Sequence, residues 1–195
     1  AATLNLTVKA ATSSSTTITA CNSYNWNGTL YTTSGDKIYQ TTNAVGCDST
    51  ATLHLTINIC LTTLNLKLFL QGYYAGGGQM LPVLLNQGIG NSSVIIDTVT
   101  VELHNSTTFA TAASVKGLLN YDGNFSVNFP PVTGNYYIVI KHRNTLETWS
   151  ANPVAVSFTA PSTYDFSNVS TKAYGNNMIQ VEAGVWAMYT GDINQ

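Results

Sequence analysis

The sequence contains few charged residues: Asp, Glu, Lys and Arg make up 8% of its 195 residues, against about 25% in an ordinary globular protein. With 7 basic and 9 acidic residues, the formal net charge is −2. We therefore expect no basic patch for nucleic acid and no acidic tail. Thr, Ser and Asn dominate instead, and such a polar, uncharged surface is typical of secreted and cell-surface β-proteins.

Long hydrophobic runs are missing as well. No apolar stretch approaches the ~20 residues needed to cross a bilayer, so we expect no membrane insertion. The sequence also contains no nucleophile-elbow motif. Its titratable side chains show no spacing that indicates a carboxylate pair or a catalytic histidine; the isolated ones are His54, His104, His142, Glu102, Glu147 and Glu182. The cluster Lys141-His142-Arg143 is interpreted as a strand end with a solvated face. We therefore expect a protein that is not an enzyme and needs no cofactor.

Cysteine is scarce, with three residues in the chain. Cys21 and Cys47 flank one compact segment, and in an exported protein we expect them to form a disulfide. Closing a loop of roughly 27 residues would stabilise the fold by about 3 kcal/mol. The alternative is two buried thiols. Cys60 follows the segment and is expected to be a buried free thiol, the alternative being a pair with another chain or a neighbouring repeat.

One seven-residue pattern occurs twice. Residues 51–57 read Ala-Thr-Leu-His-Leu-Thr-Ile, and residues 2–8 read Ala-Thr-Leu-Asn-Leu-Thr-Val. The offset of 49 residues (51 − 2) marks an internal repeat. We therefore predict that residues 1–9 are the last strand of a preceding repeat.

Alternating apolar and polar residues, separated by turn signals, predict short strands along the whole chain. In the first part, Asn27-Gly28 predicts a tight hairpin, and residues 10–16 are interpreted as a small-residue linker. A new alternating pattern begins after residue 61, and a helix of a turn or two is expected only within 80–86. The predicted strands are 17–21, 31–33, 37–42, 50–59, 64–71, 94–104, 114–120, 125–129, 136–141, 149–158, 164–169 and 181–189. The sequence thus predicts an all-β protein with two tandem β-sandwich domains, over residues 10–60 and 61–195.

Two motifs in the first domain resemble a known family. They are Cys-x-x-Tyr-x-Trp-Asn-Gly, beginning at Cys21, and Gly-Cys-Asp-Ser-Thr-Ala-Thr-Leu, ending at Leu53. Over residues 2–59 the chain resembles the small Ig-like repeats of very large surface and secreted proteins of Bacteroidetes, including gliding-type adhesins. Over residues 141–150 and 189–195 it resembles the module that often ends such proteins. The resemblance implies type IX secretion, an extracellular or cell-surface location, and sandwiches of Ig-like or prealbumin-like type.

This resemblance implies a structural or adhesive module of a large repetitive surface protein or fibre. Its expected partners are neighbouring repeats or copies of itself, and surface polysaccharide. The alternative is an accessory carbohydrate-binding module of a secreted multidomain enzyme. For that role, Tyr73 and Tyr74 in a Gly-rich loop are the candidates to stack on a sugar ring, whereas Trp26, Trp149 and Trp186 are expected in the core.

Two kinds of modification or ligand site are also expected. Ser49 and Thr98 each follow an aspartate, in Asp-Ser-Thr and Asp-Thr-Val, and these tripeptides resemble an O-glycan acceptor motif of Bacteroidetes. Asp192 and Asn194 have the spacing of the first two ligands in a calcium loop of EF-hand or dockerin type. The remaining ligand positions lie beyond Gln195, so calcium is expected only in an intact protein, and the alternative is a simple Gly-Asp turn.

Overall fold

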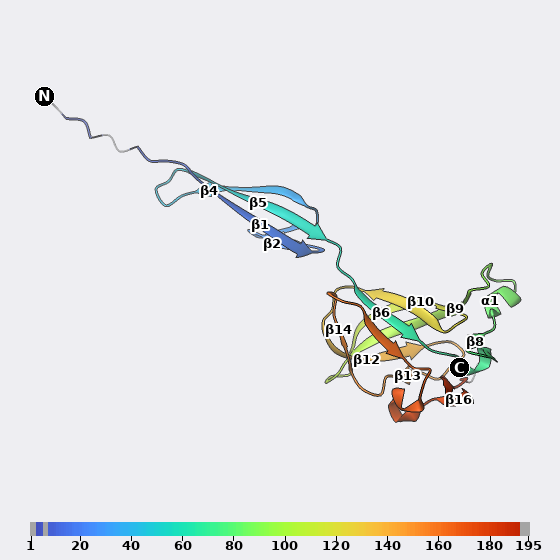
Figure 1. The fold of residues 1–195 in the computed structure, drawn as a ribbon. Coiled ribbons are helices and arrows are strands. Elements are labelled where there is room, and N and C mark those ends of the chain that lie inside the picture. Colours follow the sequence, from blue (N-terminus) through green and yellow to red (C-terminus); the bar gives the residue numbers. More distant parts are fainter. Residues whose placement is uncertain (1–2, 6–7, 192–195) are drawn as a thin grey trace. The chain divides into compact units, whose positions relative to one another are not determined.

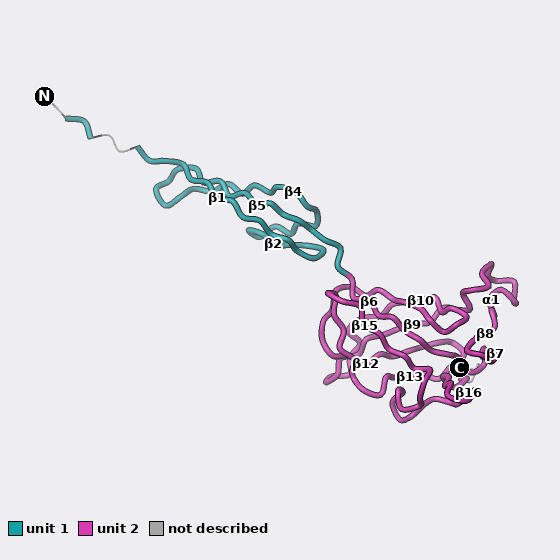
Figure 2. Tube along the Cα trace, viewed as in Figure 1, with its two compact units in different colours: residues 1–60 teal, residues 61–195 magenta. Residues whose placement is uncertain are grey.

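The structure is a computed structural model that describes residues 3–5 and 8–191. It divides the chain into two units, residues 1–60 and residues 61–195 (Figure 2). Both units are built from short strands (Figure 1), and the described helices are one short α-helix and three single 3₁₀ turns. The prediction of an all-β protein is therefore confirmed.

Unit 1 contains a three-stranded sheet and a small hairpin. Strand β5 (Asp48–Asn58) lies in the middle of the sheet, parallel to β1 (Thr12–Cys21) and antiparallel to β4 (Gly35–Thr42). The hairpin pairs β2 (Tyr24–Trp26) with β3 (Thr29–Tyr31). Among the described residues of this unit, the buried hydrophobic side chains are Leu53 and Leu55, both on β5. Its core is therefore small and rests on the central strand.

The local predictions for unit 1 have mixed outcomes. Asn27 and Gly28 have φ values of 49° and 79° and connect β2 to β3, so the predicted hairpin is confirmed. The prediction of a linker over 10–16 is wrong, because strand β1 begins at Thr12. The first six residues of β1 are exposed, so hydrophobic alternation is missing from its Ser- and Thr-rich sequence. This strand is held by its pairing with β5 along ten residues.

The described part of the predicted strand over residues 2–8 forms no strand in this structure. Leu4 and Val8 are 86% and 82% exposed, whereas Leu53, the counterpart of Leu4 in the repeat, is fully buried in β5. Residues 1–2 and 6–7 lie outside the described part of the chain. That residues 1–9 complete a preceding repeat stays a prediction.

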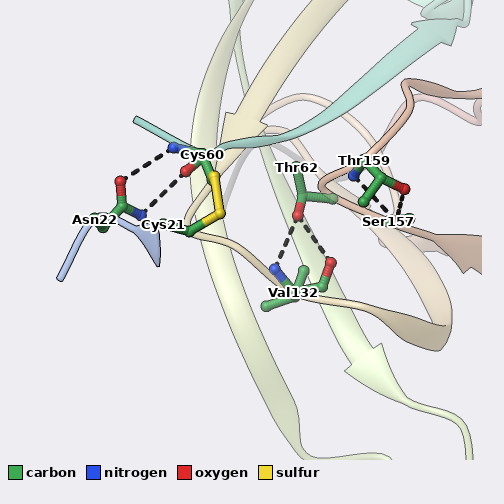
Figure 3. The surroundings of a disulfide bond; sticks show 7 residues. All are labelled: Cys21, Asn22, Cys60, Thr62, Val132, Ser157 and Thr159. Atoms are coloured by element: carbon green, nitrogen blue, oxygen red, sulfur yellow. Dashed lines mark hydrogen bonds between the residues drawn. A yellow bond between two sulfur atoms is a disulfide. The ribbon is translucent and has the colours of Figure 1, made fainter. Parts of the chain in front are cut away.

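The disulfide joins Cys21 to Cys60, so the predicted pair of Cys21 with Cys47 is wrong (Figure 3). The parallel pairing of β1 with β5 places Cys21 opposite Asn58, two residues before Cys60. Cys47 directly precedes β5, so the 11 residues of that strand separate it from this end. At about 3.3 Å per residue, they span about 35 Å. A parallel first strand, which the sequence did not reveal, thus decides the partner.

Asn22 reinforces the same end of unit 1 (Figure 3). Its side-chain amide donates to the carbonyl of Cys60 at 3.2 Å, and the backbone N–H of Cys60 donates to Asn22 Oδ1 at 3.1 Å. The backbone N–H of Asn22 donates to the carbonyl of Asn58 at 2.8 Å. The covalent bond and these three hydrogen bonds fix the C-terminal end of unit 1 to the end of β1.

Unit 2 has two packed sheets. In the first, the strands follow the order β10 (Thr111–Asn120), β9 (Ile95–Asn105), β12 (Gly134–Lys141) and β13 (Thr148–Trp149), and β14 (Val154–Val156) also pairs with β12. In the second, the order is β11 (Asn124–Phe129), β6 (Thr62–Lys67) and β15 (Ser162–Asp165). The smaller elements are η1 (Gln71–Tyr73), β7 (Tyr74–Gly76), β8 (Gln79–Met80), α1 (Val83–Asn86), η2 (Ser170–Lys172), η3 (Tyr174–Asn176), β16 (Ile179–Glu182) and β17 (Val185–Ala187).

The core of unit 2 lies between these sheets. Its buried side chains include Leu64 and Leu66 of β6, Val99, Val101 and Leu103 of β9, and Phe125, Val127 and Phe129 of β11. Close packing depends on Gly117 of β10: a Cβ atom there would lie 2.6 Å from Val127 Cγ1 and 2.7 Å from Phe125 Cδ2. Only glycine lets strand β11 approach β10 in this way. The sheets thus bury one face each, and the opposite face of the first sheet is left for other contacts.

The short helix expected within 80–86 is confirmed as α1. The single strand predicted over 181–189 is wrong, because β16 and β17 form a hairpin with a turn at Ala183 and Gly184. The strand predicted over 149–158 is interrupted between β13 and β14. None of the helices in the described ranges is long and apolar enough to cross a membrane.

Candidate functional site

The face of the first sheet that points away from the core of unit 2 carries both polar and aromatic side chains. Side chains alternate along a strand, so the residues of β9 that alternate with Val99, Val101 and Leu103 lie on this opposite face. We call it the outer face. The register aligns its residues in rows across the strands. These rows are His104 with Tyr137; Ser114, Glu102, Val139 and Trp149; and Lys116, Thr100 and Lys141.

Four aromatic side chains surround a pocket of about 360 Å³ at one end of the outer face. Tyr137 comes from β12 and Trp149 from β13, whereas Tyr174 comes from η3 and Phe109 from the loop between β9 and β10. The ring of Phe109 stacks on that of Tyr137, with centroids 5.8 Å apart, and Tyr137 lies 5.9 Å from Trp149. We call this feature the aromatic pocket. It brings together rings from four separate segments.

The pocket keeps two large rings accessible to solvent. Phe109 is 55% exposed and Tyr174 is 66% exposed. Phe109 also has a φ of 59°, in the left-handed region that a bulky residue rarely adopts. Such a conformation costs of order 1–3 kcal/mol and tends to occur where function requires it. Neither exposure nor strain at Phe109 is explained by core packing.

His104 lies under the pocket and fixes its geometry. Its Nδ1 donates to the carbonyl of Phe109 at 2.8 Å, so the imidazole anchors the strained loop. Its ring meets Trp149 edge-on, with centroids 4.6 Å apart. Its Nε2 lies 2.8 Å from Glu102 Oε2, and the side chain is almost fully buried. His104 thus joins two of the pocket rings to the charged groups beside them.

Those charged groups form a rim along one side of the pocket. The indole N–H of Trp149 donates to Glu147 Oε1 at 2.6 Å. The ammonium of Lys141 lies 2.9 Å from Glu102 Oε2 and 3.6 Å from Glu147 Oε2. The hydrogen bond from Lys141, with that from His104, holds the pKa of Glu102 below its ordinary value. Glu102 is therefore an anion at neutral pH and acts here as an acceptor that positions its neighbours.

A shallow depression of about 500 Å³ lies at the other end of the outer face. Its lining includes Lys116, Lys141, Arg143, Thr98 and Thr100. We call it the basic depression. The side chain of Arg143 is 56% exposed and that of Lys141 is 41% exposed. Lys116 is exposed and forms no ion pair with any residue that the structure describes.

Asp97 is a buried lining residue of this depression, on the core-facing side of β9 next to the exposed Thr98. Its Oδ2 accepts hydrogen bonds from Arg143 Nη2 at 2.7 Å and from the Tyr73 hydroxyl at 3.2 Å, and lies 3.2 Å from His142 Nε2. Its Oδ1 accepts from the backbone N–H of Thr98 at 2.7 Å. Burial alone would raise the pKa of Asp97, but the Thr98 N–H, the neighbouring His142 and the Arg143 charge together lower it. The carboxylate is thus ionised and its acceptor sites are already occupied.

The structure contradicts two interpretations of the residues around Asp97. Tyr73 is only 7% exposed and its hydroxyl is engaged by Asp97 and by Asn144, so it cannot stack on a sugar as proposed. The solvated strand end expected for residues 141–143 is wrong at His142, whose side chain is fully buried, whereas the side chains of Lys141 and Arg143 are 41% and 56% exposed. Burial lowers the pKa of His142.

The second stacking candidate, Tyr74, is also held in place. Its hydroxyl donates to Glu182 Oε2 at 2.5 Å and accepts from the backbone N–H of Gly78. Its ring is half-buried and meets Phe69 edge-on at 5.2 Å. Tyr74 therefore closes the β7–β8 hairpin onto β16. It has no convergent set of aromatic neighbours like that of the aromatic pocket.

The remaining predicted sites lie apart from one another. Ser49 is half-buried in β5 and accepts a hydrogen bond from Thr12 Oγ1 at 3.0 Å, whereas Thr98 is exposed on β9. O-glycans at these positions stay a prediction. Asp192 and Asn194 lie outside the described residues. Within residues 3–5 and 8–191, no group of three or more His, Cys, Asp or Glu side chains is arranged to hold a metal ion.

The sequence does not predict the aromatic pocket. It predicts Trp149 in the core, and nothing in it links Phe109, Tyr137 and Tyr174. The usable signal was the period of two on β12, which places Tyr137, Val139 and Lys141 on one face. No protein-family model, curated protein or solved structure matches this chain. The functional argument therefore rests on the geometry of the outer face.

Proposed function

We propose that the protein is an extracellular, non-catalytic adhesive module whose second unit binds polysaccharide at the aromatic pocket. The observation that carries this proposal is the convergence of four aromatic rings, two of them largely exposed, around one pocket. Concave sites lined by aromatic side chains with a few placed polar groups are the usual form of a ligand site. The polar groups nearest to these rings are Glu147, which accepts the indole N–H of Trp149, and Lys141, which lies 3.6 Å from Glu147.

A carbohydrate suits this combination better than a purely apolar ligand does. A sugar ring offers an apolar face that can lie on an aromatic ring, and its hydroxyls can bond to carboxylate and ammonium groups at the edge. Glu147 supplies the acceptors and Lys141 the donor. The strain at Phe109 supports the same proposal, because the exposed ring is retained at a conformational cost.

The first unit suits the role of a spacer. Its small core is closed by the disulfide between Cys21 and Cys60. A disulfide persists in oxidising, extracellular environments, which supports export. In this proposal unit 1 extends the chain and unit 2 provides the binding surface, so adhesion results from polysaccharide binding rather than from catalysis.

The test is a polysaccharide array probed with the full chain and with two matched variants. Tyr174→Ala removes the most exposed pocket ring, whose hydroxyl forms no hydrogen bond with the described residues. Tyr121→Ala removes an exposed tyrosine from the turn after β10, outside the pocket. We expect binding to at least one polysaccharide, weakened severalfold by Tyr174→Ala, in line with about 0.5–1.5 kcal/mol for one aromatic contact, and unchanged by Tyr121→Ala. Absence of any binding, or equal binding by all three proteins, would refute the proposal.

A further inference from the structure

We infer that the ligand of the outer face is an acidic polysaccharide, whose carboxylate or sulfate groups bind in the basic depression while a sugar ring occupies the aromatic pocket. This inference rests on the proposed function and adds the charge of the ligand to it. It also assigns a role to Lys116 and Arg143, whose exposed side chains the fold itself does not use fully.

The first argument is an excess of hydrogen-bond donors. The one carboxylate in the lining, Asp97, is 5% exposed and already accepts three hydrogen bonds, so it has little capacity left for a ligand. Lys116 brings three N–H donors and Arg143 brings five. Of the Arg143 donors, one at Nη2 is directed at Asp97. The hydroxyls of Thr98 and Thr100 add two further donors. A site with spare donors and filled acceptors favours an anion.

The second argument concerns local charge. Arg143 compensates Asp97, and Lys141 compensates Glu102, each at less than 3 Å. Lys116 then remains as the cation in this lining without a carboxylate partner among the described residues. Glu147 also lies 3.6 Å from Lys141, so both carboxylates outside the lining are held by that lysine. A bound carboxylate or sulfate would give Lys116 the ion-pair partner that it lacks among the described residues. The chain has only 7 basic residues, so placing three of them around one depression is a notable use of them.

The third argument is continuity with the aromatic pocket. Tyr137 and Lys141 lie on the same strand, four residues apart and on the same face. At about 3.3 Å per residue, this places them roughly 13 Å apart along β12. Lys116 lies in the same row as Lys141, across Thr100. An extended chain of sugars that stacks in the pocket can therefore present a charged group to the depression.

The experiment compares three polysaccharides that share one backbone: dextran, carboxymethyl-dextran and dextran sulfate. Binding to the full chain is measured by affinity electrophoresis at two salt concentrations. The variants are Lys116→Gln, the conservative Lys116→Arg, and Lys37→Gln, which makes the same change in net charge within unit 1. We expect tighter and salt-sensitive binding to one or both acidic forms. We expect Lys116→Gln to weaken that binding about fivefold, and Lys116→Arg and Lys37→Gln to leave it nearly unchanged.

The outcomes separate this inference from the proposed function through Tyr174→Ala, measured on the same probes. Tight binding to carboxymethyl-dextran alone would indicate a ligand with uronate-like carboxylates. Tight binding to dextran sulfate alone would indicate a sulfated ligand. The inference would be overturned by equal binding of all three dextrans. It would also be overturned if Lys37→Gln weakened binding to the acidic dextrans as much as Lys116→Gln does. In either case, loss of binding in Tyr174→Ala would still support the aromatic pocket. Acidic binding that Tyr174→Ala leaves intact would overturn the proposed function, and absence of binding to all three would overturn the inference.

Discussion

Removing Cys60 should unfold unit 1 and leave unit 2 folded. The disulfide between Cys21 and Cys60 closes a loop with a sequence separation of 39 residues. On the chain-entropy estimate, such a loop contributes about 4 kcal/mol to the free energy of unfolding. The buried hydrophobic side chains of unit 1, Leu53 and Leu55, contribute of order 1.5–3 kcal/mol each. The disulfide is therefore as large a contribution as this core, and unit 1 should not remain folded without it.

The three tryptophans make the experiment specific for each unit. Trp26 reports on unit 1, and Trp149 and Trp186 report on unit 2. Urea titrations followed by the indole N–H signals in two-dimensional NMR give a separate transition for each unit. In Cys60→Ser we expect the Trp26 transition to be lost or shifted by about 4 kcal/mol, with those of Trp149 and Trp186 unchanged.

The matched control is Cys47→Ser. Cys47 is half-buried and forms no disulfide in the described structure, so its replacement by serine should change the stability of unit 1 by less than about 1 kcal/mol. The reasoning is refuted if Cys47→Ser has the large effect and Cys60→Ser the small one, because Cys21 would then pair with Cys47. Equal small effects of both variants would show that the disulfide contributes little.

Two further predictions concern unit 2. Phe109→Gly should abolish polysaccharide binding. It should change the stability of unit 2 by no more than about 1 kcal/mol, because relief of the positive φ offsets the lost contact with Tyr137. Urea unfolding and array binding test this together, and a large loss of stability would contradict the strain argument. Burial lowers the pKa of His142, so the unfolded state binds more protons and unit 2 should lose stability as pH falls below about 6.5, a loss that His142→Gln should remove. The lowered pKa values of Asp97 and Glu102 add a second loss below about pH 4, as each carboxylate is protonated on the way down to its folded-state value. Urea midpoints at pH 7.5, 5.5 and 3.5 measure both steps, and a midpoint independent of pH would contradict them.

The sequence was informative wherever a strand has one buried face. The alternation on β9 and β11 and the turn at Asn27 and Gly28 indicated those elements correctly, because burial on one side imposes a period of two. The first six residues of β1 gave no such signal, because they are exposed. Missing β1 also led to the wrong disulfide, since only the parallel pairing of β1 with β5 brings Cys21 to Cys60.

The candidate site was less predictable for a different reason. Its rings come from β12, β13, a loop and a 3₁₀ turn, and no local pattern relates positions 109, 137, 149 and 174. The Gly-rich loop makes Tyr73 a stacking candidate in the sequence, but in the fold Tyr73 is buried and its hydroxyl bonds to Asp97 and Asn144. Sites assembled by tertiary contacts of this kind require the topology to be known first.

The most direct test of polysaccharide binding by the outer face uses the indole signals again. The array identifies a bound polysaccharide, and an oligosaccharide from it is titrated into the wild-type chain. Trp149 lines the pocket, and its indole N–H donates to Glu147 at 2.6 Å, so the signal of this N–H should shift on binding. Trp26 of unit 1 and Trp186, outside the pocket, should not respond. A saturable shift of Trp149 alone is the predicted result, and a shift confined to Trp26 or Trp186 would contradict binding at the outer face.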